Sequence, residues 1–237
     1  MTDNITTVTF FKMSGLKNKF YGFTQVQAAL KQMEGVPGLK FVKTLGTGGG
    51  DGFSLRPDFS TYAFLMVWEN RAHADAFYAK NNFYLHYKQR SEESFTLYLK
   101  NAMAHGRWSG QNPFKSAAKV HPDKPVVVLT RARIKTEKLI TFWTNVGSAA
   151  DDLHRYNDLL FGVGVGELPA IQQATISFWK TAAAMSDFAY SSKHHKKVIQ
   201  LTRKNNWYKE ELFARFVPFD VFGSWNNKPF DKYIARL

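Results

Sequence analysis

The chain passes twice through one order of predicted elements, and this repeat limits the folds available to it. Strand-like apolar runs and amphipathic helical runs alternate as β-α-β-β-α-β up to residue 105 and again from residue 125 onward. This is the element order of a ferredoxin-like unit, whose two helices cover only one face of its sheet. The open apolar face of each sheet has to be buried, and a second unit can bury it. The sequence therefore predicts an α+β fold of two tandem ferredoxin-like units packed sheet to sheet, as an intrachain dimeric α/β barrel with a ligand space between the sheets.

Individual positions support the repeat because they recur in the same order. Trp68 ends a predicted strand in the first unit, and Trp179 ends one in the second. The other matched positions are Gly46, Gly48 and Gly50 with Gly162, Gly164 and Gly166, Asp51 with Glu167, Asp75 and Tyr78 with Asp187 and Tyr190, and Gly106, Trp108 and Pro113 with Gly223, Trp225 and Pro229. The predicted domains are residues 1–115 and 125–237, joined by a linker at 116–124.

Periodicity also places the elements within each unit. Strands are predicted at 8–13, 39–45, 62–68, 95–104, 125–132, 174–179 and 212–219, and helices at 23–33, 70–90, 137–159 and 182–204. Apolar residues at Phe23, Val26, Leu30 and Met33 give the first helix its amphipathic spacing. The glycine-rich runs at 46–52 and 162–166 are predicted to be tight turns, because neither leads directly into the helix that a dinucleotide-binding fingerprint needs.

Composition excludes several kinds of cofactor site. Aromatic residues make up 16% of the chain, which suits a Phe-rich core or a pocket for a flat apolar ligand. The chain has no cysteine, which excludes disulfides, zinc–thiolate sites, iron–sulfur clusters and thiolate-ligated haem. The N-terminus lacks a secretory signal pattern, and no apolar run approaches the length of a transmembrane helix. We therefore expect a cytoplasmic protein without stable membrane insertion.

The charge balance favours acidic partners. The formal net charge is +13, which suits an acidic electron donor or the propionates of haem. The basic residues are spread along most of the chain, and no nucleic-acid-binding motif accompanies them. We therefore expect no nucleic-acid partner.

A set of motifs in the second unit is shared with a known family. The motifs are VLTRA at 128–132, FW at 142–143, GVGE at 164–167, QATIS at 173–177, Trp179, Tyr190, His195 and the strand at 211–216. Through these residues the chain resembles the spheroidene monooxygenase family of carotenoid-oxygenating enzymes. In the N-terminal half the resemblance is thinner and is carried mainly by LGTG at 45–48 and by the spacing of elements.

The resemblance implies a haem-dependent monooxygenase with haem b, and thus iron, bound between the two sheets. It implies an apolar or amphipathic, carotenoid-like substrate, with O2 and an external electron donor such as ferredoxin as further partners. Since a cysteine ligand is absent, histidine is the most common remaining haem ligand. The internal repeat provides within one chain what single-repeat proteins obtain by dimerising, so both a monomer and a homo-oligomer fit.

His195 is the candidate iron ligand, because the family pattern also has a histidine there and Phe83 stands opposite it in the first repeat. The alternatives are a pocket or surface role for His195 without iron, or His194 as the ligand. Neighbouring helical residues point about 100° apart, so at most one of the two faces a pocket. Five of the seven histidines are predicted to be exposed or to lack a supporting cluster: His73, His86, His105, His121 and His154.

Four further residues are predicted to bind the cofactor. Arg131 and Arg215 lie in predicted strands of the second unit, where each pairs with a propionate, anchors a polar group of the substrate or forms a structural ion pair. Trp179 and Tyr190 either line the pocket or belong to the core. No catalytic residue is predicted beyond these.

Two other functions remain open from the sequence. A histidine-ligated haem in this fold also suits a dehydratase that binds a substrate nitrogen, as in aldoxime dehydratases. A haem-binding protein without turnover is the third possibility. A Soret absorption band and its response to His195→Ala separate these from a haem-free protein.

Overall fold

The computed structural model describes residues 4–48, 57–154, 156–168, 170–191 and 200–234. The first half contains β1 (Ile5–Met13), α1 (Gly15–Gln32), β2 (Leu39–Gly48), β3 (Pro57–Trp68), α2 (Arg71–Lys80), α3 (Asn82–Arg90) and β4 (Ser91–Gly106). The second half contains β5 (Val126–Ile134), a 3-10 turn (Thr136–Lys138), α4 (Leu139–His154), β6 (Leu159–Leu168), β7 (Gln172–Trp179), α5 (Ala182–Ser191), β8 (Tyr208–Trp225), β9 (Lys228–Pro229) and a 3-10 turn (Asp231–Tyr233). Residues 200–205 are also helical.

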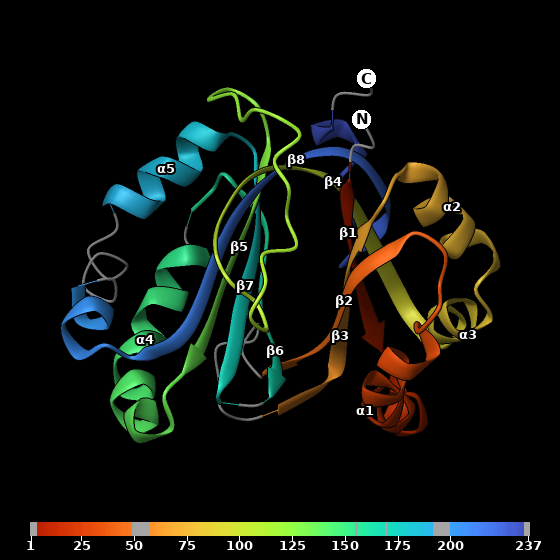
Figure 1. Ribbon diagram of the computed structural model, residues 1–237, viewed down its shortest axis with the longest axis horizontal. Helices are drawn as coiled ribbons and strands as arrows, with labels where there is room; N and C mark the ends of the chain where they lie inside the picture. Colours follow the sequence, from red (N-terminus) through yellow and green to blue (C-terminus); the bar gives the residue numbers. More distant parts are fainter. Residues whose placement is uncertain (1–3, 49–56, 155, 169, 192–199, 235–237) are drawn as a thin grey trace.

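The strands form one antiparallel sheet that closes on itself. Its order is β4-β1-β3-β2-β6-β7-β5-β8-β9, and a further pairing of β4 with β8 completes the barrel. Each half contributes four strands in ferredoxin-like order, first strand between fourth and third. Helices α1, α2 and α3 lie outside the first half, and α4 and α5 lie outside the second (Figure 1). The predicted fold class is confirmed.

The two halves also share their strand register. Trp68 pairs with Ile5 of β1 and Leu39 of β2. Trp179 pairs in the same way with Val126 of β5 and Leu159 of β6. Positions in one half can therefore be matched to positions in the other strand by strand. This register matches Gly162 with Val42, so the predicted match of Gly162 with Gly46 is wrong.

Two seams join the halves, and they differ in length. The seam of β4 with β8 runs from Phe95, opposite Gly223, to Gly106, opposite Leu212. The seam of β2 with β6 has two pairs only, at Gly46 and Thr47. Gly106 and Gly223 both have positive φ, and a Cβ at either would collide with a backbone carbonyl of the partner strand. Glycine is therefore required at both ends of the long seam.

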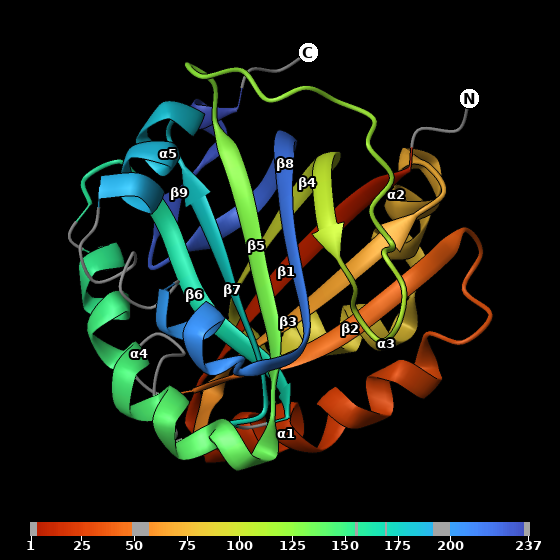
Figure 2. The same ribbon diagram turned by 60° about the vertical axis from the view of Figure 1, so that its left-hand side comes forward.

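Side chains fill most of the barrel interior. Alternate residues of all eight barrel strands point inward and form one apolar cluster that includes Phe10, Phe95, Phe161, Phe178 and Phe216. Figure 2 shows the strands of both halves side by side around the barrel. The expectation of an open ligand space between the sheets is thus wrong for most of the interior, because aromatic and aliphatic side chains from both halves occupy it.

Two local predictions need correction. The glycine run at 162–166 lies within strand β6 and is not a turn, since Val163 and Val165 between the glycines point into the barrel core. The helix predicted at 70–90 is two helices, because Asn81 ends α2 and its side chain accepts the backbone N–H of Tyr84 to cap α3. Within the described ranges, every helix is too short or too polar to cross a lipid bilayer.

Candidate functional site on the outer face of the second half

The outer sheet face of the second half has lost bulk relative to the first. Strand register matches Phe64 of β3 with Thr175 of β7, since Phe64 is opposite Thr9 and Thr175 is opposite Thr130. The same matching pairs Phe11, Tyr62, Met66, Tyr98 and Val42 with Ala132, Gln173, Ser177, Arg215 and Gly162. Aromatic and large aliphatic residues are thereby replaced by small or polar ones. The helix layer of the second half consequently covers a shallower sheet surface.

Thr130 shows where this surface is open. It lies at the middle of β5 and is solvent-exposed, although Val128 and Ala132 on either side of it on the same face are buried. Its counterpart Thr9 is completely buried and hydrogen-bonds the hydroxyl of Tyr78 at 2.9 Å. The outer core of the second half is split into two clusters, one with Val128 and one with Ile134. The opening at Thr130 lies between them.

The residues that the sequence predicts to bind the cofactor lie on both faces of the sheet. Trp179 and Arg215 are on the outer face of the sheet, where Trp179 is buried and donates to Ser177 Oγ at 2.9 Å. Tyr190, on α5, is 69% exposed, whereas its repeat counterpart Tyr78 is half-buried and its hydroxyl hydrogen-bonds Thr7 and Thr9. The prediction for His195, and the alternative of His194, lies outside the described residues.

Arg215 is a polar residue at this face with a buried donor that lacks a hydrogen-bond partner. Its guanidinium carbon lies 5.4 Å from the ring centroid of Phe213, and its Nε is buried without a hydrogen-bond partner. Tyr98 occupies the matching position in the first half and donates to Asp75 at 2.9 Å. A buried guanidinium N–H without an acceptor is costly, so an anionic group bound beside Arg215 would satisfy it.

Arg131 lies inside the barrel and has carboxylate partners. It is 3% exposed, forms an ion pair with Glu210 and lies 3.6 Å from Glu167. Glu167 also accepts a hydrogen bond from Trp108 Nε1 at 2.7 Å and from Lys43 Nζ at 2.6 Å. The residues link both halves at the β2–β6 end of the barrel. The geometry is that of a structural ion-pair network, one of the roles expected for Arg131.

Glu210 is ionised within this network. Burial disfavours its charge, but the backbone N–H groups of Gly110 and Ser109 and the Arg131 guanidinium outweigh burial and hold the pKa of Glu210 below its ordinary value. Glu93 occupies the equivalent place at the other end of the long seam. It accepts the backbone N–H groups of Asn226 and Asn227, and its pKa is also lowered against the effect of burial.

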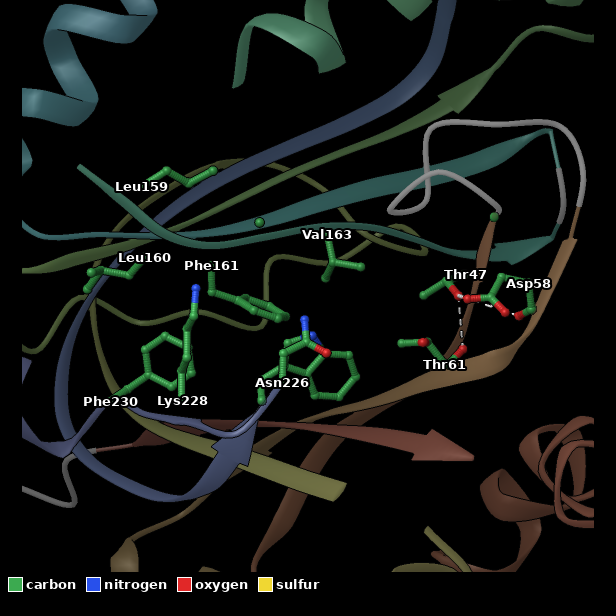
Figure 3. A pocket seen from close by; sticks show the side chains of 13 residues that line it. Thr47, Asp58, Thr61, Leu159, Leu160, Phe161, Val163, Asn226, Lys228 and Phe230 are labelled. Carbon is green, nitrogen blue, oxygen red and sulfur yellow. Dashed lines mark hydrogen bonds between the residues drawn. The ribbon is translucent and has the colours of Figure 1, made fainter. Parts of the chain in front are cut away.

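A cavity of about 240 Å³ remains where the short seam ends. Phe161, Val163 and Phe230 give it apolar walls, and Asp58 and Lys228 lie among its polar residues (Figure 3). Thr47 and Thr61 complete a polar group at the Asp58 end, where Thr47 Oγ1 donates to the Thr61 carbonyl at 3.1 Å. The expected space between the sheets exists in this limited form, at one end of the barrel.

The histidines with described side chains offer no metal cluster. His86, His105 and His121 are exposed, and His73 is packed against Gly38 in the first half. Among the residues that the structure describes, no group of three or more His, Cys, Asp or Glu side chains is placed to hold a metal ion. Haem needs only one protein ligand, so this finding bears on multi-ligand metal sites.

Comparison with known proteins identifies the family. The chain is 32% identical over 226 residues to spheroidene monooxygenase of Rhodobacter capsulatus, a match that covers 94% of each protein. It is 32% identical over 223 residues to spheroidene monooxygenase of Cereibacter sphaeroides, covering 94% of this chain and 69% of that protein. The chain belongs to the spheroidene monooxygenase family. It is therefore a monooxygenase, an oxidoreductase, and the resemblance seen in its motifs is confirmed.

Solved structures support the fold. A crystal structure of aldoxime dehydratase superimposes with a TM-score of 0.64 at 8% identity, over 92% of this chain and 82% of that one. A second, of aldoxime dehydratase (OxdRE) in complex with butyraldoxime, has a TM-score of 0.61 at 8% identity, over 92% and 80%. At such low identity these matches show a common fold alone. No family model matches the chain.

Sequence reasoning missed the residues that define the open face. Thr130 and Thr175 lie within the VLTRA and QATIS motifs, but nothing in the sequence assigns them to an open face, and the glycines of β6 resemble a turn. The internal repeat holds a usable signal, because aligning the halves strand by strand exposes the exchange of aromatic residues for small ones. The match of Trp68 with Trp179 already aligns β3 with β7, and the structure extends the alignment to the other strands.

Proposed function

We propose that the protein is a haem-dependent monooxygenase that inserts one oxygen atom into a carotenoid or a similar long apolar polyene. The substrate class is supported by the relatives, which are named for spheroidene, a carotenoid. In the reaction, one atom of O2 enters the substrate and the other leaves as water. Two electrons come from an external donor such as a ferredoxin. The net charge of +13 favours an acidic donor.

The observation that supports haem is the open outer face of the second half. A flat macrocycle needs a broad surface without large side chains, and the exchange of Phe64, Phe11 and Tyr62 for Thr175, Ala132 and Gln173 provides one. Apolar clusters border the opening on both sides, as burial of the macrocycle requires. The residues present therefore fit the group at this face better than in the filled interior.

Each predicted residue has a distinct role at this face. Arg215, with its buried unpaired Nε, would bind a propionate. His195, four residues beyond the end of α5 at Ser191, remains the proposed iron ligand, with His194 as the alternative. Phe188 of α5 packs against Trp179 of β7 with ring centroids 5.3 Å apart. This contact fixes α5, the helix that precedes His194 and His195 in the sequence. When bound, haem supplies the activation of O2.

In the proposal, Tyr190 and Arg131 act without contacting the cofactor. Tyr190 points to solvent and leaves the space over Thr130 that Tyr78 fills in the first half, so its contribution is to keep the face open. Arg131, held by Glu210 and Glu167, supports the sheet from inside and would not contact the cofactor directly. The dehydratase alternative rests on a shared fold alone, whereas family membership favours oxygenation.

Absorption spectroscopy tests the cofactor. Protein reconstituted with haem should show a Soret band, and His195→Ala should lose it or shift it strongly. His194→Ala is the neighbouring control, and His121→Ala controls for an exposed histidine outside the site. A spectrum unchanged in His195→Ala would refute the ligand assignment, and protein that binds no haem but oxygenates a carotenoid would refute the haem proposal. Product formation that requires both O2 and a reductant separates oxygenation from dehydration.

A further inference from the structure

The outer surface of α1 carries an apolar stripe that faces solvent. Its large side chains and their exposed fractions are Leu16 (89%), Phe20 (70%), Phe23 (52%) and Leu30 (40%). At about 100° per residue, these four positions fall within an arc of about 80° on the helix. Single exposed apolar residues are ordinary, but four large ones on one face of a helix mark a surface that contacts something else.

The stripe is separate from the side of α1 that holds the helix to the sheet. Val26, Ala29 and Met33 are buried in the outer core of the first half. On that side the Tyr87 hydroxyl donates to the carbonyl of Gly22 at 3.2 Å. The helix was predicted to bury Phe23 and Leu30 with Val26 and Met33, and the structure instead divides them between two faces. The exposed face is therefore not part of the fold's own packing.

Charge identifies the partner of this stripe. The helix Gly15–Gln32 contains Lys17, Lys19 and Lys31 and no acidic residue. Lys19 and Lys31 project on opposite sides of the stripe, each about 60° from its centre line. A helix that combines an apolar face with flanking lysines has the composition of helices that lie in the interface of an anionic bilayer. We propose that α1 docks the protein on an anionic lipid surface, with the stripe in contact with the acyl chains and the lysines with the headgroups.

The stripe also extends to the cavity at the short seam. Phe59 of β3 is 43% exposed, and its ring packs edge-on against Phe23 with centroids 5.2 Å apart. Its sequence neighbours Asp58 and Thr61 line the cavity. Docking through α1 would thus bring the cavity next to the lipid. A carotenoid resides in lipid because it is apolar, so docking would deliver it; this last step rests on the proposed function, but the docking does not.

Vesicle sedimentation tests the docking directly. Wild-type protein should pellet with vesicles of phosphatidylglycerol and phosphatidylcholine in equal parts, and much less with phosphatidylcholine alone. The variant Leu16→Ser/Phe20→Ser should lower the partition coefficient by about tenfold or more, because two large apolar side chains no longer enter the bilayer. Reversal of charge in Lys19→Glu/Lys31→Glu should lower it by roughly fivefold for each lysine.

Matched variants control for exposure and charge. Ile140→Ser removes a side chain that is 82% exposed on α4, and Lys115→Glu/Lys119→Glu reverses two exposed lysines far from α1. Neither should change vesicle binding. All substitutions are on the surface, so thermal unfolding should stay close to wild type.

Several results would overturn the proposal. One is wild-type protein that sediments with neither vesicle, and another is full binding by Leu16→Ser/Phe20→Ser. A wild-type dimer that this variant converts to a monomer, without vesicle binding, would instead make the stripe an interface between copies. Sedimentation needs neither haem nor turnover, so its failure is distinguishable from failure of the proposed function.

Discussion

The outer faces of the two half-barrels are built on the same strand register but are packed differently. In the first half, Phe64 and Tyr87 have ring centroids 4.9 Å apart, and Tyr78 reaches the sheet to hydrogen-bond Thr7 and Thr9. In the second half, the position of Phe64 is held by Thr175, and Thr130 is exposed. One face serves stability and the other has been freed of bulk. A repeated fold thus allows one copy to hold the barrel together while the other leaves a less filled surface.

We expect the largest effect on stability when Phe64 of the first half is replaced by threonine, the residue at the matching position 175 of the second half. Phe64→Thr removes a fully buried ring from the aromatic cluster and leaves a cavity with a hydroxyl in it. We expect the free energy of unfolding to fall by about 3–5 kcal/mol. Urea denaturation measures it. Haem bound per folded molecule should not change, and a loss below about 1 kcal/mol would show that this cluster does not stabilise the barrel.

Replacing Arg215, whose buried Nε has no hydrogen-bond partner, should weaken the proposed cofactor site without weakening the fold. Arg215→Leu deletes the charged donor from the outer face of β8, so the affinity for haem should fall by about 1.5–3 kcal/mol, roughly tenfold to a hundredfold. Titration with haem measures this change. Arg133→Leu, at an exposed position of β5, is the control. Equal affinity in the Arg215 variant would remove Arg215 from the site.

The charged carboxylates at the two ends of the long seam should make stability depend on pH. The pKa values of Glu210 and Glu93 are lowered in the folded protein by hydrogen bonds that outweigh burial. Their stabilisation is therefore complete above the ordinary carboxyl pKa and is lost as the pH falls through the lowered values. Glu210→Gln should cost about 1.5–3 kcal/mol at neutral pH, and Glu93→Gln should cost less, because Glu210 also pairs with buried Arg131.

Urea denaturation at several pH values between about 7 and 3 measures this dependence. The loss of stability toward acid should be smaller in either glutamine variant than in wild type. A variant whose acid sensitivity equals that of wild type would show that its carboxylate is not a source of the pH dependence.

We expect the smallest effect on stability when Thr175 of the second half is replaced by phenylalanine, the residue at the matching position 64. The effect should fall on haem uptake. Thr175→Phe should fill the opening beside Thr130 and change the free energy of unfolding by no more than about 1 kcal/mol. Haem uptake should be abolished because the ring occupies its place. Thr175→Val, which adds no ring, should still bind haem. Full haem uptake by Thr175→Phe would place the cofactor elsewhere.

The sequence predicts the architecture better than the site, for physical reasons. Strand and helix periodicity follow from local alternation, and the recurrence of Trp68 as Trp179 reports a register that the structure confirms. Gly162 and Gly164 were interpreted as turn residues because glycine favours turns, yet glycine also leaves space on a strand face. The face is open because Thr175 is smaller than Phe64 at the matching position. A smaller side chain within one strand does not change the local pattern of apolar and polar residues, so the sequence of that strand alone does not reveal the opening.

The location of the ligand space could not be predicted for a related reason. Two open sheet faces predict that something lies between them, but they do not say whether side chains or a ligand fills the space. Phe10 and Phe161, from opposite halves, have ring centroids 4.7 Å apart in the interior. For Arg131 the sequence leaves a cofactor-binding and a structural role open, and its carboxylate partners Glu210 and Glu167 are visible only in the folded chain.

The pairing of β4 with β8 has a consequence for any fragment of this chain. A separated half would present β4 or β8 as a long unpaired edge, with a free row of backbone donors and acceptors and an apolar inner face. Such an edge is a template for strand addition by another chain. Expressed alone, either half should therefore assemble with a second copy of itself or aggregate, and co-expression of the two halves should restore a closed barrel.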